Sequence, residues 1–99
     1  MTTDLTHAAF SENLDSEFSV KDDTRAQPLK LINVSERKTS PPYEQFSITF
    51  CGDPEMELEQ GTFCLEHPTM GSFDIFLVPV RRDTHGMYYE AIFNYLAET

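Results

Sequence analysis

Cys64 and His67 are the residues of this chain whose types and spacing best suggest chemistry. A thiol and an imidazole three residues apart would serve as a nucleophile with its base, or as two zinc ligands. Residues three apart on a strand point to opposite faces, and the sequence contains no second Cys-x-x-Cys or His-x-x-His pair to complete a zinc site. His67 precedes Pro68, which favours a turn position. We therefore predict no catalytic residue and no metal ligand here.

The second cysteine, Cys51, does not change this conclusion. Two cysteines are too few for a disulfide scaffold, so we expect both thiols to be reduced. If residues 45–51 and 61–66 pair as strands, Cys64 faces Ser47, which lies four residues from Cys51. That separation is about 13 Å, beyond the roughly 7 Å between Cα atoms that a disulfide spans.

An acidic run follows at residues 53–59, where Asp53, Glu55, Glu57 and Glu59 alternate with other residues. The run lacks the Asp-x-Asp-x-Asp-Gly pattern of a calcium loop, so a solvated loop between two strands is favoured over a metal site. If the protein has a surface for a basic partner, we expect it at these four carboxylates.

No other motif indicates an active site. The chain has no Gly-x-Ser-x-Gly and no glycine-rich phosphate loop among its 4 glycines, so we expect no cofactor and a non-enzymatic protein. One alternative stays open: a barrel that binds a small ligand, or a weak enzyme, with a pocket formed by Tyr88, Tyr89, Glu90 and His67.

Length and charge narrow the class of protein. Ninety-nine residues with 8 Phe and 4 Tyr predict one domain over 1–99 with an aromatic core. A formal charge of −10 repels nucleic acid and anionic membranes, so any partner is expected to be a protein, either basic or a second copy. We expect residues 1–5 to be disordered and, with no signal or membrane-spanning segment, a cytoplasmic location.

The pattern of apolar residues predicts a mostly β fold. Thr6 as N-cap, with Phe10 and Leu14 on one stripe, predicts a short helix over 6–14 that packs at one end of a β domain spanning 17–96. Pro41-Pro42 marks the loop over 36–44 as non-strand. We expect a small barrel or a strongly bent meander of about six antiparallel strands, at 17–21, 29–35, 45–51, 61–66, 72–80 and 87–96.

Two strand pairs can be aligned by their apolar faces. Phe46 is expected opposite Leu65 and Ile48 opposite Phe63, because that register gathers apolar side chains on one face. The last two strands are apolar on both faces, so one face should line the core and the other should meet the helix, a loop or a partner protein. The expected interior residues are Phe46, Ile48, Phe50, Phe63 and Phe76.

Several short motifs together resemble a bacterial family of domains of unknown function. They are Gln60-Gly61-Thr62-Phe63, His67-Pro68, Gly71, the run Phe73-Asp74-Ile75-Phe76-Leu77-Val78-Pro79-Val80, and Tyr89-Glu90-Ala91-Ile92-Phe93-Asn94. The resemblance spans the chain from Phe10 onward, and its motifs are specific only as a set. It implies a small β-rich domain without assigned enzyme activity or cofactor, associated with phage-tail-collar-like proteins in an accessory or assembly role.

Overall fold

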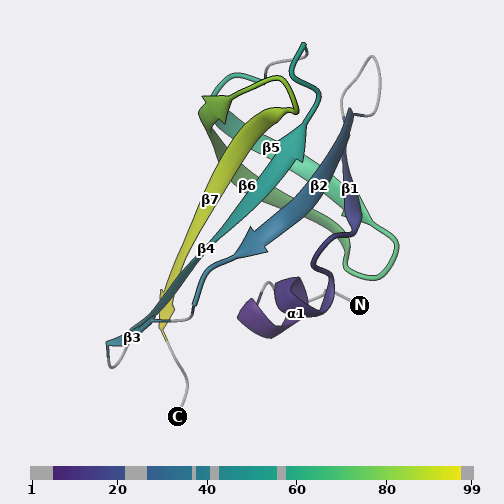
Figure 1. The fold of residues 1–99 in the computed structure, drawn as a ribbon. Coiled ribbons are helices and arrows are strands. Elements are labelled where there is room, and N and C mark those ends of the chain that lie inside the picture. The colour runs from purple at the N-terminus through teal and green to yellow at the C-terminus, as the bar shows by residue number, and fades with distance from the viewer. Residues whose placement is uncertain (1–5, 22–26, 37, 41–42, 56–57, 97–99) are drawn as a thin grey trace.

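A computed structural model describes residues 6–21, 27–36, 38–40, 43–55 and 58–96 (Figure 1). These residues form one helix and seven strands. In chain order they are α1 (His7–Glu12), β1 (Glu17–Val20), β2 (Gln27–Val34), β3 (Lys38–Ser40), β4 (Tyr43–Gly52), β5 (Gly61–His67), β6 (Gly71–Arg82) and β7 (Met87–Leu96). The expectation for residues 1–5 falls outside the described part of the chain.

Six of the strands close into an antiparallel barrel, which confirms the predicted fold class. Around the barrel the order is β1, β2, β4, β7, β6 and β5, and β5 pairs with β1 to close the ring. Among the described strands, β3 pairs with β4 alone and extends the sheet beyond the ring. The arrangement is a Greek key, because β5, β6 and β7 are successive neighbours and β7 returns to lie beside β4.

The predicted pairing of the third and fourth expected strands is wrong. β4 does not pair with β5; Phe46 lies opposite Phe93 and Ile48 opposite Ala91 on β7. Residues 53–60 connect β4 to a strand on the other side of the barrel. Apolar alternation identified the inward face of β4 correctly, but every inward-facing strand of a barrel offers the same apolar pattern, so alternation alone does not select the neighbour.

The loop expected over 36–44 is also partly wrong, because β3 and the start of β4 form a short hairpin there. Lys38 pairs with Gln45 and Ser40 with Tyr43. Pro41 and Pro42 themselves lie outside the described residues. The prolines predicted a break in strand pattern, but they did not show that the residues on either side of them pair with each other.

The barrel interior is filled with side chains. Phe46, Ile48 and Phe50 are buried as predicted, and Phe63 is half-buried against the same core. Phe76 is an exception, because it points outward and is 51% exposed. Other fully buried side chains are Phe18, Val20, Leu29, Leu31, Leu65, Leu77 and Tyr89.

Helix α1 closes one end of the barrel (Figure 1), as the sequence predicted. The Thr6 hydroxyl accepts a hydrogen bond from the Ala9 amide at 3.1 Å, which makes Thr6 the N-cap. Phe10 is completely buried and contacts the rings of Phe18, Phe46, Phe73 and Phe93. The helix ends at Glu12, before Leu14, which is 44% exposed and does not extend the expected stripe.

Candidate functional site

The acidic run predicted as a partner surface lies on the connection between β4 and β5. Asp53, Glu55 and Glu59 are exposed, whereas Glu57 is outside the described residues. The Asp53 carboxylate accepts a hydrogen bond from the Glu55 amide at 2.9 Å, a local turn contact. No group of three or more metal-ligating side chains occurs among the residues that the structure describes.

The structure does not bring together the four residues of the hypothetical ligand pocket. His67 lies opposite Gly71, and Tyr88 lies opposite Arg81. These positions on β6 are ten residues apart, or about 30 Å along a strand. His67 and Tyr88 therefore sit at opposite ends of the barrel.

The two tyrosines also point in opposite directions. The Tyr89 ring fills the barrel interior, and its hydroxyl accepts a hydrogen bond from the Leu58 amide at 2.8 Å. Tyr88 faces outward beneath the Arg81 guanidinium, 4.3 Å from the ring centroid, and its hydroxyl donates to the Asp83 carboxylate at 3.3 Å. Desolvation and the Asp83 hydrogen bond raise the pKa of Tyr88. Both rings are held by neighbouring groups rather than presented to a cavity.

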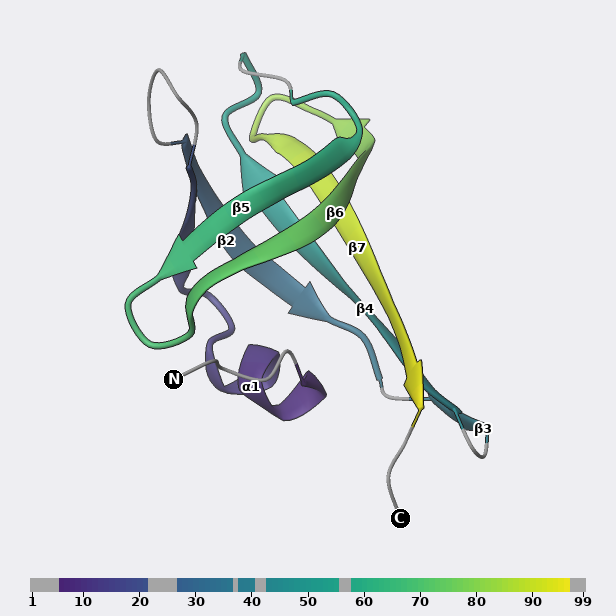
Figure 2. The same cartoon turned by 180° about the vertical axis from the view of Figure 1, so that it is seen from behind.

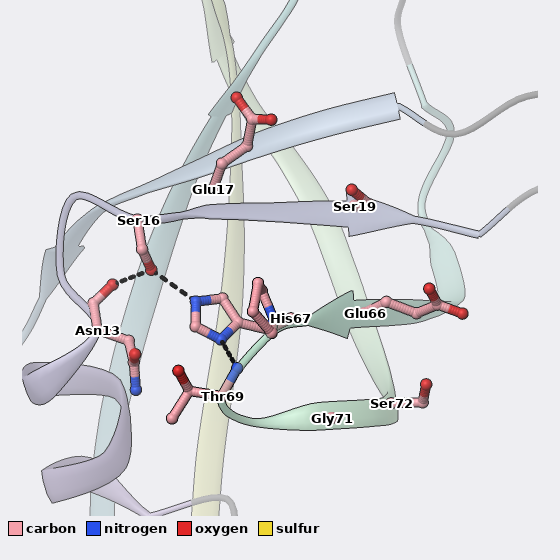
Figure 3. A pocket seen from close by; sticks show the side chains of 10 residues that line it. Asn13, Ser16, Glu17, Ser19, Glu66, His67, Thr69, Gly71 and Ser72 are labelled. Carbon is pink, nitrogen blue, oxygen red and sulfur yellow. Dashed lines mark hydrogen bonds between the residues drawn. The ribbon is translucent and has the colours of Figure 1, made fainter.

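A hollow of about 800 Å³, lined mostly by residues of polar type, surrounds His67 at the end of the barrel near α1 (Figure 3). It is open to solvent, and its wall comes from the segment after α1, from β1 and from the β5–β6 turn. Gly71, with φ of 76°, permits that turn. The lining residues are Asn13, Ser16, Glu17, Ser19, Glu66, His67, Pro68, Thr69, Gly71 and Ser72.

Ser16 and His67 form the one contact in this hollow that resembles a catalytic pair. The Ser16 Oγ lies 2.9 Å from His67 Nε2, although the two residues are 51 positions apart in sequence. His67 Nδ1 lies 3.1 Å from the Thr69 amide and 3.2 Å from the Met70 amide. Figure 3 shows the ring held between Ser16 and the turn that follows it.

The hydrogen-bond directions favour a structural role for this pair over that of an activated nucleophile. Two backbone amides donate to Nδ1, so Nδ1 carries no proton and the neutral ring bears its hydrogen on Nε2. Nε2 therefore donates to Ser16, whose own hydrogen goes to the Asn13 carbonyl. A histidine that donates to a serine cannot accept its proton. Burial also lowers the pKa of His67, which favours the neutral ring.

The cysteines lie on separate parts of the barrel. Cys51 on β4 faces Tyr88, and Cys64 on β5 faces Asp74. Both are free and half-buried. The strand pairing from which we predicted their separation was wrong, because β4 pairs with β7 and β5 with β6.

The outer face of β6 and β7 carries most of the exposed apolar side chains. Phe76 is 51%, Val80 53% and Ile92 63% exposed, whereas Leu14 and Ile32 are the other large apolar residues exposed in the described part of the chain. The sequence predicted this second apolar face but wrongly assigned Phe76 to the interior. Pro79 is half-buried between Val78 and Val80, where β6 and β7 shift register.

A cleft of about 370 Å³ lies between β6 and β7 on this side of the barrel. Its lining is mostly apolar and includes inward-facing and outward-facing residues of both strands. The residues are Asp74, Ile75, Phe76, Val78, Glu90, Ala91, Ile92 and Phe93. Sequence periodicity missed the cleft, because it depends on where two strands separate.

The geometry defines a small closed antiparallel barrel, plugged by a helix at one end and bearing an apolar cleft on its side. Residues 5–93 match the model of the family described as "Domain of unknown function (DUF6916)", and the chain belongs to that family. No curated protein and no solved structure matches the chain. No helix in the described segments is long and apolar enough to cross a membrane.

Proposed function

We propose that this protein is a non-enzymatic interaction domain that docks another protein on the outer face of β6 and β7. The supporting observation is the concentration of exposed apolar side chains on that face: Phe76, Val80 and Ile92 are each more than half exposed. Soluble proteins rarely expose contiguous apolar surface that has no function. The barrel supplies a rigid support, because the opposite faces of the same strands line a filled core.

The non-enzymatic part of the proposal draws on the hollow near α1. His67 is a hydrogen-bond donor to Ser16 and an acceptor for two backbone amides, which is a structural role. An accessory role in the assembly of a larger structure fits a small rigid domain of this kind. The acidic loop at Asp53, Glu55 and Glu59 would add attraction for a basic partner.

The alternative function, a small-ligand barrel, has weaker support. The barrel interior is occupied by side chains such as Tyr89 and Phe50, and the large hollow beside His67 is wide open to solvent. Sites for small organic ligands are typically enclosed and mostly apolar. This alternative predicts a ligand that protects the β5–β6 turn from hydrogen exchange.

The test is an affinity capture from a native bacterial lysate with a matched set of variants. Phe76→Thr combined with Ile92→Thr removes the docking face and keeps residues that favour strands. Ile32→Thr, at an outward position on β2 that is 36% exposed, is the control. We expect proteins retained by the wild type and the control to be lost with the double variant. Identical retention by all three proteins would overturn the proposal.

A further inference from the structure

The kind of partner that would bind this face follows from how β6 and β7 separate, so the inference rests on the proposed function. The two strands pair from their hairpin, Arg82 with Met87, as far as Val78 with Glu90. Beyond that point Gly71–Leu77 continues only against β5, and Ala91–Leu96 only against β4. Figure 2 shows β6 and β7 together at the hairpin and diverging toward opposite sides at the other end.

The diverging edges carry backbone groups that lie beyond the β6–β7 ladder. The Cys64 carbonyl accepts a hydrogen bond from the Lys21 amide, on the side of β5 that faces β1. Because successive residues of a strand direct their backbone groups to alternate sides, the backbone groups of Phe63 and Leu65 point to β6. Their partners on β6, Ile75 and Phe73, therefore point back to β5. By the alternation of antiparallel strands, the N–H and C=O groups of Asp74 and Phe76 point toward β7.

The same argument applies on β7. The Ser47 carbonyl accepts a hydrogen bond from the Ser35 amide, and the Ser47 amide donates to the Ser35 hydroxyl, both on the side of β4 away from β7. Phe46 and Ile48 therefore direct their backbone groups to Phe93 and Ala91. The backbone groups of Ile92 and Asn94 consequently point toward β6. Among the described residues the β6–β7 ladder stops at Val78 and Glu90, so beyond that point these two strand edges face each other across the apolar cleft without a ladder between them.

The cleft has the length and lining of a site for a short extended chain. From Asp74 to Val78 is about 13 Å of strand, enough for four or five residues in an extended conformation. Ile75, Ala91 and Phe93 form its inner side. Phe10 packs against Phe93, so the plug of the barrel closes the cleft from within. Apolar side chains pointing inward from a bound strand would meet only apolar groups.

Charge indicates which chain would fit. The cleft lining carries two carboxylates, Asp74 and Glu90, and no Lys or Arg. A second copy would bring the same carboxylates and a further charge of −10 to the interface, so self-association is opposed. Outward-pointing Lys or Arg side chains of a bound strand would instead lie near Asp74 and Glu90.

We propose that the cleft between β6 and β7 binds an extended, basic segment of a partner protein by strand addition. The segment pairs with the backbone groups of Asp74 and Phe76 or of Ile92 and Asn94. Its apolar side chains alternate with Lys or Arg, so that one set enters the cleft and the other faces the two carboxylates. Backbone hydrogen bonds provide general affinity in such complexes, and the alternating side chains provide specificity.

The test uses three fluorescein-labelled peptides and fluorescence anisotropy. The first is Lys-Val-Lys-Val-Lys-Val with blocked ends. The second replaces each Lys by Glu, and the third keeps the basic sequence but is N-methylated at two adjacent central residues, which removes one hydrogen-bond donor on each side of the strand. We expect the first peptide to bind, and the other two to bind about tenfold more weakly or worse.

Two further measurements locate the site. Asp74→Asn combined with Glu90→Gln should weaken the binding of the basic peptide by about threefold or more, as expected for the loss of two exposed ion pairs. The same double variant should not weaken the binding of the acidic peptide. Amide exchange should slow at residues of the cleft edges, on Asp74 and Phe76 or on Ile92 and Asn94, when the basic peptide is added.

The outcomes separate this inference from the function on which it rests. Equal binding of the basic and N-methylated peptides would overturn strand addition, and equal binding of the basic and acidic peptides would overturn the basic partner. If no peptide binds but Phe76→Thr with Ile92→Thr still loses captured proteins, the docking face stands and strand addition fails. If neither effect is seen, both proposals fail.

Discussion

Replacement of His67 tests whether this residue holds the β5–β6 turn together or titrates as a catalytic group. In the wild type, Nδ1 accepts from the buried Met70 amide and the partly buried Thr69 amide, and the ring lies 4.3 Å from that of Phe18. Leaving a buried donor unpaired costs about 1–3 kcal/mol. His67→Ala leaves both amides without this acceptor and removes the contact with Phe18, so it should lower the free energy of unfolding by about 2–4 kcal/mol. His67→Asn should cost about 1–2 kcal/mol, because the Asn side-chain oxygen can accept from the same amides.

The pH dependence of the free energy of unfolding tests the neutral state of His67 more directly. Burial lowers the pKa of folded His67, whereas the unfolded chain takes up a proton near pH 6.5. Below about pH 6.5 the unfolded state therefore binds more protons, and the free energy of unfolding falls as pH falls until the folded pKa is passed. The maximum slope is about 1.4 kcal/mol per pH unit for one such group.

Urea unfolding of the wild type, His67→Ala and His67→Asn at pH 7.5 and pH 5.5 measures both effects. Asn does not titrate, so the stability lost in His67→Asn should shrink as the pH is lowered. A loss that stays constant or grows on acidification would mean that His67 is protonated in the folded protein, and would refute the assignment of a neutral, donating ring. Nitrogen NMR of the ring offers an independent check, with the proton expected on Nε2.

Three further substitutions test the packing of the barrel, each by urea or thermal unfolding. Phe10→Ala should lower the free energy of unfolding by about 3–5 kcal/mol, because it removes the buried ring at the end of the barrel. The control Leu14→Ala, at an exposed position, should lower it by less than about 1 kcal/mol. Equal losses would contradict the packing role of Phe10. Gly86→Ala should destabilise the protein, because its Cβ would lie 2.8 Å from a backbone oxygen, while Gly61→Ala, with no contact closer than 3.9 Å, should have little effect; a neutral Gly86→Ala would show that the hairpin adjusts freely. Tyr89→Phe should cost about 1–3 kcal/mol by leaving a buried amide without its acceptor, and an unchanged midpoint would contradict that hydrogen bond.

The elements of the fold were largely predictable from local pattern. Alternation located the barrel strands to within a few residues, and Thr6 marked the start of α1, because these signals depend on neighbours within one turn or one strand. β3 was missed because Pro41-Pro42 breaks a pattern without showing whether pairing resumes beside it. Leu14 was assigned to the helix because its i,i+4 spacing from Phe10 matched, although the helix ends first.

The candidate site was only partly predictable. The apolar outer face of β6 and β7 was visible in the sequence, since both faces of those strands are apolar. The contact between Ser16 and His67 was not, because 51 residues separate them and no local pattern links the two. The four residues grouped as a ligand pocket were brought together only by their chemical types, and the structure separates His67 from Tyr88 by most of the length of β6.

The sequence by itself determined that the chain forms an acidic, aromatic-rich antiparallel β fold with a short helix at its start, because composition and periodicity fix which surfaces must be buried. The tertiary structure alone decided which strands are neighbours. Pairing β4 with β7 rather than β5 closes the barrel, and the point at which β6 and β7 separate creates the apolar cleft. Both depend on how six strands share one ring, and several strand orders satisfy the same alternation of apolar and polar residues.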